Sequence, residues 1–126
     1  MALIIVTDDD AMIRTMLSDA LTSVGHTVFL AENGYQCLGY LKRSRPDLVL
    51  TDIFMPDKDG IETICEIHDR WPEIKIIAMS GGGSRPEAMD YLTAAEGFGA
   101  ARILRKPFSV KQVLQMVDEV LGALVS

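Results

Sequence analysis

The sequence predicts one α/β domain, a doubly wound five-stranded parallel sheet with helices on both faces. Three observations favour it. Apolar, β-prone runs alternate five times with segments of helical periodicity, the connections between them are short, and the third run is apolar on both faces. Right-handed crossovers between parallel strands leave few other topologies for this order. The 126 residues match one ordinary domain, so we expect residues 1–126 to form a single unit.

Each predicted strand is a short run rich in aliphatic residues that ends at polar or turn-forming residues. The strands are expected at residues 3–7, 27–31, 48–51, 74–79 and 100–104. Each predicted helix repeats apolar residues every three or four positions. The helices are expected at residues 11–24, from 34 to about 44, at 61–71, from 84 to about 96, and from 109 onward.

Capping and helix-breaking residues mark where these elements begin and end. Asp10 and Asp59 precede helices as N-caps, and Ser84 has capping-box spacing to a glutamate three positions later. Gly25 ends the first helix, and Pro46 forces an extended approach to the third strand. The boundaries therefore follow from local chemistry as well as from periodicity.

The composition excludes several classes of protein. The formal net charge is −6 and the twelve Lys and Arg residues are scattered, which argues against a nucleic-acid-binding surface. No apolar run approaches the roughly 18 residues that cross a bilayer, and the N-terminus has no signal-peptide pattern. Cys37 and Cys65 have no second Cys or His at metal spacing, so we expect reduced thiols. We expect a cytoplasmic protein that binds neither membrane nor nucleic acid directly.

Polar side chains follow four of the five predicted strands. They are Asp8 and Asp9 after the first strand, Asp52 after the third, Ser80 after the fourth and Lys106 after the fifth. Because parallel strands bring their carboxyl ends to one edge of the sheet, these groups are expected to converge there. Each residue alone has an ordinary explanation as a cap or loop residue; the whole set at one edge does not.

Crowded carboxylates repel one another unless a cation lies between them, and Mg²⁺ takes one or two carboxylates, waters and phosphate oxygens. We therefore predict a Mg²⁺ site that uses Asp9 and Asp52 directly, with Asp8 acting through water. Lys106 and the Ser80 hydroxyl would hold the oxygens of a phosphoryl group. Asp52, the most central carboxylate, is then the predicted nucleophile that forms an aspartyl phosphate.

These motifs resemble the receiver domain of two-component response regulators, over nearly the whole chain and in order. The motifs are Asp8-Asp9, Asp52 followed by Met55-Pro56 and Asp59-Gly60, Ser80, and Lys106-Pro107-Phe108. The resemblance implies a receiver (CheY-like, flavodoxin-like) fold and a phosphorylation switch that needs Mg²⁺. It also implies that the backbone carbonyl of Phe54 is a further metal ligand, that Ser80 and Lys106 sense the phosphoryl group, and that the Lys106–Pro107 bond is cis.

The chain departs from the family pattern at two places. Ile103 stands at the switch position where many receivers carry an aromatic residue that turns inward on phosphorylation. Three glycines follow Ser80, which predicts a loop of wide conformational freedom, so we expect switching to depend on this loop and the fourth helix. Phe54 and Gly82 are expected to border the path of the water that removes the phosphoryl group.

The implied partners are a sensor histidine kinase or histidine phosphotransfer protein, and either a downstream target or a fused output domain. By resemblance, the face made by the fourth helix, the fifth strand and the fifth helix would bind a partner or form a homodimer. Such a protein phosphorylates and dephosphorylates only itself. Two alternatives remain: a small Mg²⁺-dependent phosphohydrolase with an aspartyl nucleophile, suggested by the spacing of Asp8 and Asp10, and a receiver that docks without being phosphorylated.

Overall fold

The computed structural model describes residues 1–53, 60–80 and 97–125, and the side chains up to residue 122. Its five strands lie parallel in one sheet in the order β2-β1-β3-β4-β5. The strands are β1 (Leu3–Thr7), β2 (Thr27–Ala31), β3 (Leu48–Asp52), β4 (Lys75–Ser80) and β5 (Arg102–Arg105). The order places β3 in the middle of the sheet, as the apolar character of both its faces predicts.

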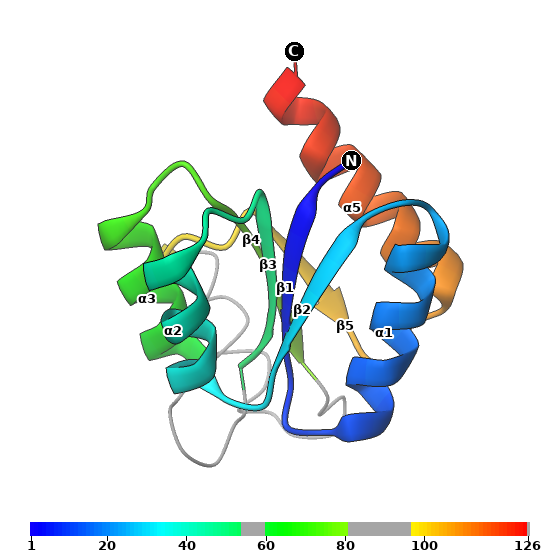
Figure 1. Ribbon diagram of the computed structural model, residues 1–126, viewed down its shortest axis with the longest axis horizontal. Helices are drawn as coiled ribbons and strands as arrows, with labels where there is room; N and C mark the ends of the chain where they lie inside the picture. The colour runs from blue at the N-terminus through cyan, green and yellow to red at the C-terminus, as the bar shows by residue number, and fades with distance from the viewer. Residues whose placement is uncertain (54–59, 81–96, 126) are drawn as a thin grey trace.

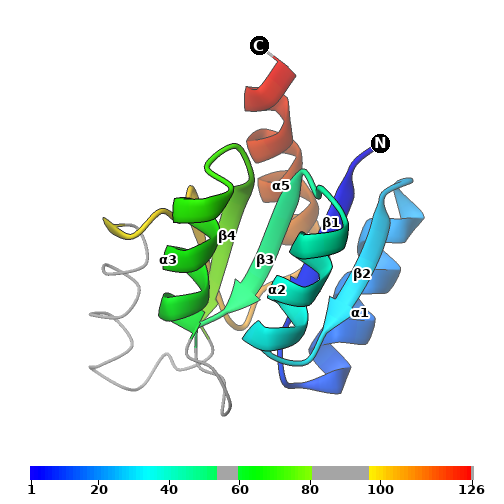
Figure 2. The same cartoon turned by 60° about the vertical axis from the view of Figure 1, so that its left-hand side comes forward.

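The described helices cover both faces of the sheet (Figure 1). They are α1 (Ala11–Ser23), α2 (Gly34–Arg43), α3 (Gly60–Arg70) and α5 (Val110–Val125). Helices α2 and α3 lie together on one face, as Figure 2 shows from the side, while α1 and α5 cover the other. The predicted doubly wound α/β fold is therefore confirmed.

Two hydrophobic cores result from the alternation of side chains along the strands. Ile5 and Val49 point towards α2 and α3, whereas Ile4 and Leu50 point towards α1 and α5. Burial of both faces is what makes the central strands uniformly apolar in sequence. The sheet, packed on both faces, therefore supports the loops at its carboxyl edge that carry the predicted site residues.

Most predicted boundaries agree with the structure to within one or two residues. The fifth strand begins later than predicted, at Arg102 and not at residue 100, because Gly99 still turns the chain with φ 128°. Ala101 then donates its backbone N–H to the carbonyl of Ile76 at 2.8 Å, which starts the pairing with β4. The predicted helix at 84–96 and the Asp59 cap lie outside the described residues.

Three described helices begin at a side-chain N-cap, as predicted for Asp10, and at α5 the Ser109 hydroxyl accepts from the backbone N–H of Gln112 at 3.1 Å. The Asp10 carboxylate accepts a hydrogen bond from the backbone N–H of Met12 at 2.9 Å, and the Asn33 side chain accepts from that of Gln36 at 2.9 Å. The cap at Asp10 matters for the site, because it fixes how the chain leaves β1 and enters α1.

The two cysteines are free thiols, as predicted. Cys37 is buried in the core beneath α2, and burial raises the pKa of its thiol to about 11. Cys65 is only partly buried. Among the described residues, no helix combines the length and the apolar character needed to cross a membrane.

Candidate functional site

The register of the sheet brings four strand ends to one edge. Thr7 of β1 lies beside Thr51 of β3, and Ser80 of β4 lies beside Arg105 of β5. The next residues along β1 and β5 are Asp8 and Lys106, and Asp52 ends β3 itself. The residues predicted from the strand ends therefore lie together at the carboxyl edge of the sheet.

Three carboxylates form a tight cluster at this edge. One oxygen from each of Asp8, Asp9 and Asp52 lies within 4.8 Å of the others. Asp8 and Asp52 are buried, whereas Asp9 is exposed. Three oxygen donors at this spacing, open to solvent on one side, suit a hard divalent cation that keeps part of its water.

Lys106 supplies the positive charge of the cluster. Its ammonium nitrogen lies 2.6 Å from Oδ2 of Asp8 and 3.3 Å from Oδ2 of Asp52. Burial alone would lower the pKa of Lys106, but the hydrogen bonds and the negative charges of Asp8 and Asp52 outweigh it, so the pKa lies above its ordinary value. Lys106 therefore remains an ammonium ion and bridges two strand ends.

Asp8 is held from three directions. Its backbone N–H donates to the carbonyl of Ala31 at 3.1 Å, which ties the end of β1 to the end of β2. Its Oδ1 accepts from the backbone N–H of Asp10 at 2.9 Å, while Oδ2 accepts from Lys106. Asp10 uses its own carboxylate as the helix cap, so it does not take part in the cluster.

Ser80 lies at the end of β4 and is buried. Its carbonyl accepts the backbone N–H of Lys106 at 2.8 Å, so the peptide that positions Ser80 also positions the lysine. The Lys106–Pro107 bond that follows is cis, as the resemblance implies. The edge of the sheet thus holds the serine and the lysine in a fixed relation.

Gly60 has a role that the sequence did not reveal. It begins α3 directly beneath the end of β3, and its N–H donates to the carbonyl of Ile53 at 3.2 Å. A Cβ at this position would lie 2.3 Å from the carbonyl oxygen of Asp52. The sequence predicts Asp59 as a helix cap and indicates no role for Gly60 beyond the motif, but the structure shows that the glycine allows α3 to pack against the backbone of Asp52.

Several predicted residues lie elsewhere. Phe54, Gly82 and the glycines that follow Ser80 are outside the described residues. Ile103 lies beside Ala78 of β4 and packs, half-buried, against the core under α2 and α3. This side chain already occupies an inward position without an aromatic ring.

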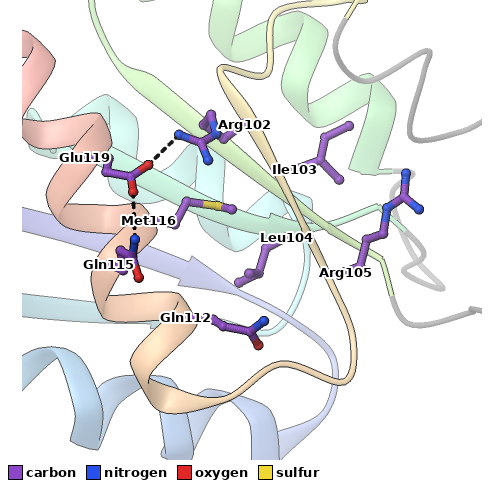
Figure 3. Close-up of a pocket in the computed structure, with 8 residues that line it drawn as sticks. All are labelled: Arg102, Ile103, Leu104, Arg105, Gln112, Gln115, Met116 and Glu119. Atoms are coloured by element: carbon purple, nitrogen blue, oxygen red, sulfur yellow. Dashed lines mark hydrogen bonds and ion pairs between the residues drawn. The ribbon is translucent and has the colours of Figure 1, made fainter.

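Several shallow hollows lie outside the acidic cluster in the described part of the chain. One, of about 300 Å³, lies between β5 and α5, and Figure 3 shows Arg102, Gln115 and Glu119 along it. Arg102 pairs with Glu119 at 2.8 Å, and hydrogen bonds from Arg102 and Gln115 lower the pKa of Glu119. Another, of about 360 Å³, lies at the amino edge of the sheet beside His26 and Asp47.

A family model and curated relatives match this chain over most of its length. The model of the response regulator receiver domain matches residues 4–118. The chemotaxis protein CheY of Bacillus subtilis is 36% identical over 120 residues, covering 94% of this chain and 97% of that protein. The transcriptional regulator NtrC of Azospirillum brasilense is 36% identical over 122 residues, covering 97% of this chain.

The relatives differ in length. This chain spans 24% of that NtrC, whereas it spans nearly all of CheY. Among solved structures, the receiver domain of NtrX from Brucella abortus superposes with a TM-score of 0.87 at 26% identity, covering 94% of this chain and 98% of the other. The match with these proteins is therefore confined to one kind of domain.

Proposed function

This chain belongs to the response regulator receiver domain family, and we propose that it is a phosphorylation-dependent signalling switch whose phosphoryl acceptor is Asp52. The observation that carries this proposal is the single ammonium group of Lys106, which lies 2.6 Å from Asp8 and 3.3 Å from Asp52 at the edge where the strands end. The ammonium group thus contacts both the carboxylate proposed as acceptor and its acidic neighbour Asp8, which supports the proposal.

The proposed reaction transfers a phosphoryl group from the phosphohistidine of a sensor kinase or a phosphotransfer protein. A carboxylate oxygen of Asp52 forms the new bond to phosphorus while the phosphorus–nitrogen bond breaks, and the leaving imidazole keeps the bonding electron pair. Asp52 ends the central strand, so its backbone is fixed by pairing to β4. This pairing would hold the backbone of the proposed acceptor in place.

The acidic cluster fits a Mg²⁺ ion. Asp9 and Asp52 would hold it directly and Asp8 through water, and the Phe54 carbonyl is a further proposed ligand from the family resemblance. Bound there, the ion would neutralise charge on the phosphoryl oxygens. Lys106 already offsets part of the carboxylate charge, which leaves a net negative site that still attracts a divalent cation.

Lys106 and Ser80 are proposed to hold the phosphoryl oxygens once Asp52 is modified. The ammonium group can exchange its contact with Asp52 for a contact with the phosphoryl group without leaving Asp8. The shared peptide contact between Lys106 and Ser80 would pass this change to the end of β4. The product is thus a changed surface and not a released metabolite.

The enzyme alternative has little support at the site. A phosphohydrolase that used Asp8 and Asp10 as its paired carboxylates would need the Asp10 side chain beside the substrate. In the structure, that side chain caps α1 through the N–H of Met12. A receiver that docks without phosphorylation would have no use for three crowded carboxylates.

The proposed partner surface lies along β5 and the start of α5. Residues 101–117 carry Arg102, Arg105, Lys106 and Lys111 and no acidic residue, although the whole chain has a net charge of −6. Arg102 is paired with Glu119 within the hollow between β5 and α5 (Figure 3), so Arg105, which also lines it, is the charge proposed to meet an acidic side chain of a partner. A homodimer through the face of the fourth helix, β5 and α5, a fused output domain and a cytoplasmic location remain predictions.

The test is the intact mass of the protein after incubation with acetyl phosphate and Mg²⁺. We expect one added phosphoryl group, its loss when a chelator is present, and none on Asp52→Asn. Asp47→Asn is the matched control, because it makes the same change at the opposite edge of the sheet. Phosphoryl incorporation into Asp52→Asn at the level of the unmodified protein would contradict the proposal.

A further inference from the structure

Arg14 makes a contact with the acidic loop that none of the predicted site residues makes. It lies in the second turn of α1, with a side chain only 14% exposed. Its Nη1 donates a 2.6 Å hydrogen bond to the backbone carbonyl of Asp8. Its Nη2 lies 3.8 Å from Oε1 of Glu32, the residue that follows β2. The guanidinium thus joins the loop after β1 to the loop after β2.

The bonded carbonyl belongs to the peptide between Asp8 and Asp9. A peptide unit is planar, so fixing the direction of this carbonyl also fixes the plane from which the Cα of Asp9 projects. The other contacts of the loop hold its ends: the N–H of Asp8 donates to Ala31, and the N–H of Asp10 donates to the Asp8 carboxylate. Arg14 is the contact that holds the middle, between the two acidic residues.

The geometry of Arg14 also leaves the carboxylates free. Among its described contacts, the guanidinium meets Asp8 through the carbonyl and not through the carboxylate. The oxygens of the acidic cluster therefore remain available to Lys106 and to a cation. Glu32 offsets part of the arginine charge, and its own N–H is held at 2.8 Å by the Gln36 side chain of α2.

We propose that Arg14 is a positioning residue for the cation site: it fixes the Asp8–Asp9 peptide and so presents both carboxylates to Mg²⁺. The biological purpose of this contact rests on the proposed function. Its test does not, because the test measures metal binding. Groups that hold metal ligands in place are worth at least about tenfold in metal affinity. A planar guanidinium suits the role because it bonds to the carbonyl with one nitrogen and faces Glu32 with another.

The experiment compares Arg14→Met with a matched arginine. Arg45 donates from Nη1 to the carbonyl of Leu41 at 2.7 Å, so Arg45→Met removes the same kind of bond at the other end of the molecule. Calorimetric titration with MgCl₂ measures the dissociation constant of each variant, and urea unfolding measures its stability. We expect Arg14→Met to weaken Mg²⁺ binding about tenfold and Arg45→Met to leave it unchanged, although both lose some stability.

Arg14→Lys provides a second variant in case the methionine variant folds poorly. It keeps the charge and one donor but loses the planar fork, so we expect about threefold weaker Mg²⁺ binding. Mg²⁺ affinity unchanged in both folded Arg14 variants would overturn the inference, as would an equal loss in Arg45→Met. If the unmodified protein binds Mg²⁺ but accepts no phosphoryl group, the proposed function fails, and the role of Arg14 is still decided by the titrations.

Discussion

Both edges of the sheet carry ionisable side chains, but these side chains have different roles. At the amino edge, Asp47 accepts the N–H of Leu3 at 2.9 Å and His26 accepts that of Ala2 at 3.2 Å. Each satisfies a backbone group at the start of β1. At the carboxyl edge, three carboxylates lie within reach of one another and share the ammonium of Lys106.

This difference separates charges that stabilise the fold from charges that cost stability. A carboxylate that accepts a backbone N–H at the surface stabilises the folded chain, because the bond is charge-assisted and the carboxylate stays hydrated. Crowded, partly buried carboxylates repel and lose water, so their presence at one edge points to chemistry. The two edges are therefore expected to respond in opposite ways when a charge is removed.

The largest loss of stability is expected from Gly60→Ala, because this substitution adds a methyl group between α3 and the end of β3 at the carboxyl edge. The new methyl group would lie 2.3 Å from the Asp52 carbonyl oxygen and 2.4 Å from the Cα of Ile53, so α3 and the end of β3 must separate. We expect a loss of about 3 kcal/mol in the free energy of unfolding, at the upper end for overpacking, measured with urea. Gly122→Ala is the control, because a Cβ there meets no atom within 4 Å.

Removing the shared cation should cost the next largest amount. Lys106→Met leaves Asp8 buried beside Asp52 without its ion pair, so we expect a loss of about 2 kcal/mol at neutral pH, below the range for fully buried pairs because the lysine is 15% exposed. The same variant should bind Mg²⁺ more tightly, since a positive charge next to the cation is gone. Weaker Mg²⁺ binding in a calorimetric titration would contradict this view of the cluster.

The pH dependence of the Lys106 contribution has a definite sign. The folded-state pKa is raised above 10.5, so the stabilisation is complete below pH 10.5 and disappears as the pH rises through the folded value. The stability difference between the unmodified protein and Lys106→Met should therefore be constant near neutrality and shrink in strong alkali. Cys37, whose pKa is about 11, is present in both proteins, so its contribution cancels in this stability difference.

Neutralising one carboxylate at each edge should change the free energy of unfolding in opposite directions. Asp52→Asn relieves repulsion while the Asp8–Lys106 pair remains, so we expect a gain of about 1 to 2 kcal/mol. Asp47→Asn weakens the bond to the N–H of Leu3, so we expect no gain and a loss of about 0.5 kcal/mol. Urea unfolding of both variants in parallel checks this, and a gain in both would remove the distinction between the edges.

A further small effect is expected at Thr7, one residue before Asp8. Among the described residues its buried hydroxyl meets only the thiol of Cys37, a weak hydrogen-bond partner, so Thr7→Val should raise stability by about 1 kcal/mol. The hydroxyl of Thr22 donates to the carbonyl of Ser18 at 2.7 Å and serves as the comparison. Thr22→Val should bring no such gain in the same unfolding measurement.

The sequence was sufficient for the fold and for the choice of edge. Alternating periodicities determine the order of strands and helices, and parallel pairing then forces the residues after each strand to converge. Hence Asp8, Asp52 and Lys106 could be grouped without coordinates. The predicted start of β5 was two residues too early. The turn at Gly99 depends on where β4 begins to pair with β5, and this is a contact between distant segments.

The supporting residues could not be predicted in the same way. Gly60 matters because of the backbone that lies against it, and Arg14 because its side chain folds back along α1 to a carbonyl six residues earlier. Neither relation leaves a periodic or compositional signal, since both are distances between atoms of different elements. Sequence patterns identify charged groups at strand ends; three-dimensional packing identifies what holds them.

The contact between Lys106 and Asp8 joins residues 98 positions apart in the chain. During synthesis all three carboxylates leave the ribosome well before the lysine that neutralises them, and the first and last strands of the sheet must both be in place before they meet. Under the proposed function, an unfinished or half-folded chain therefore carries the acceptor but not the assembled site. Only a completely folded domain would then be phosphorylated. Phosphorylation would therefore also report that synthesis and folding of the domain are complete.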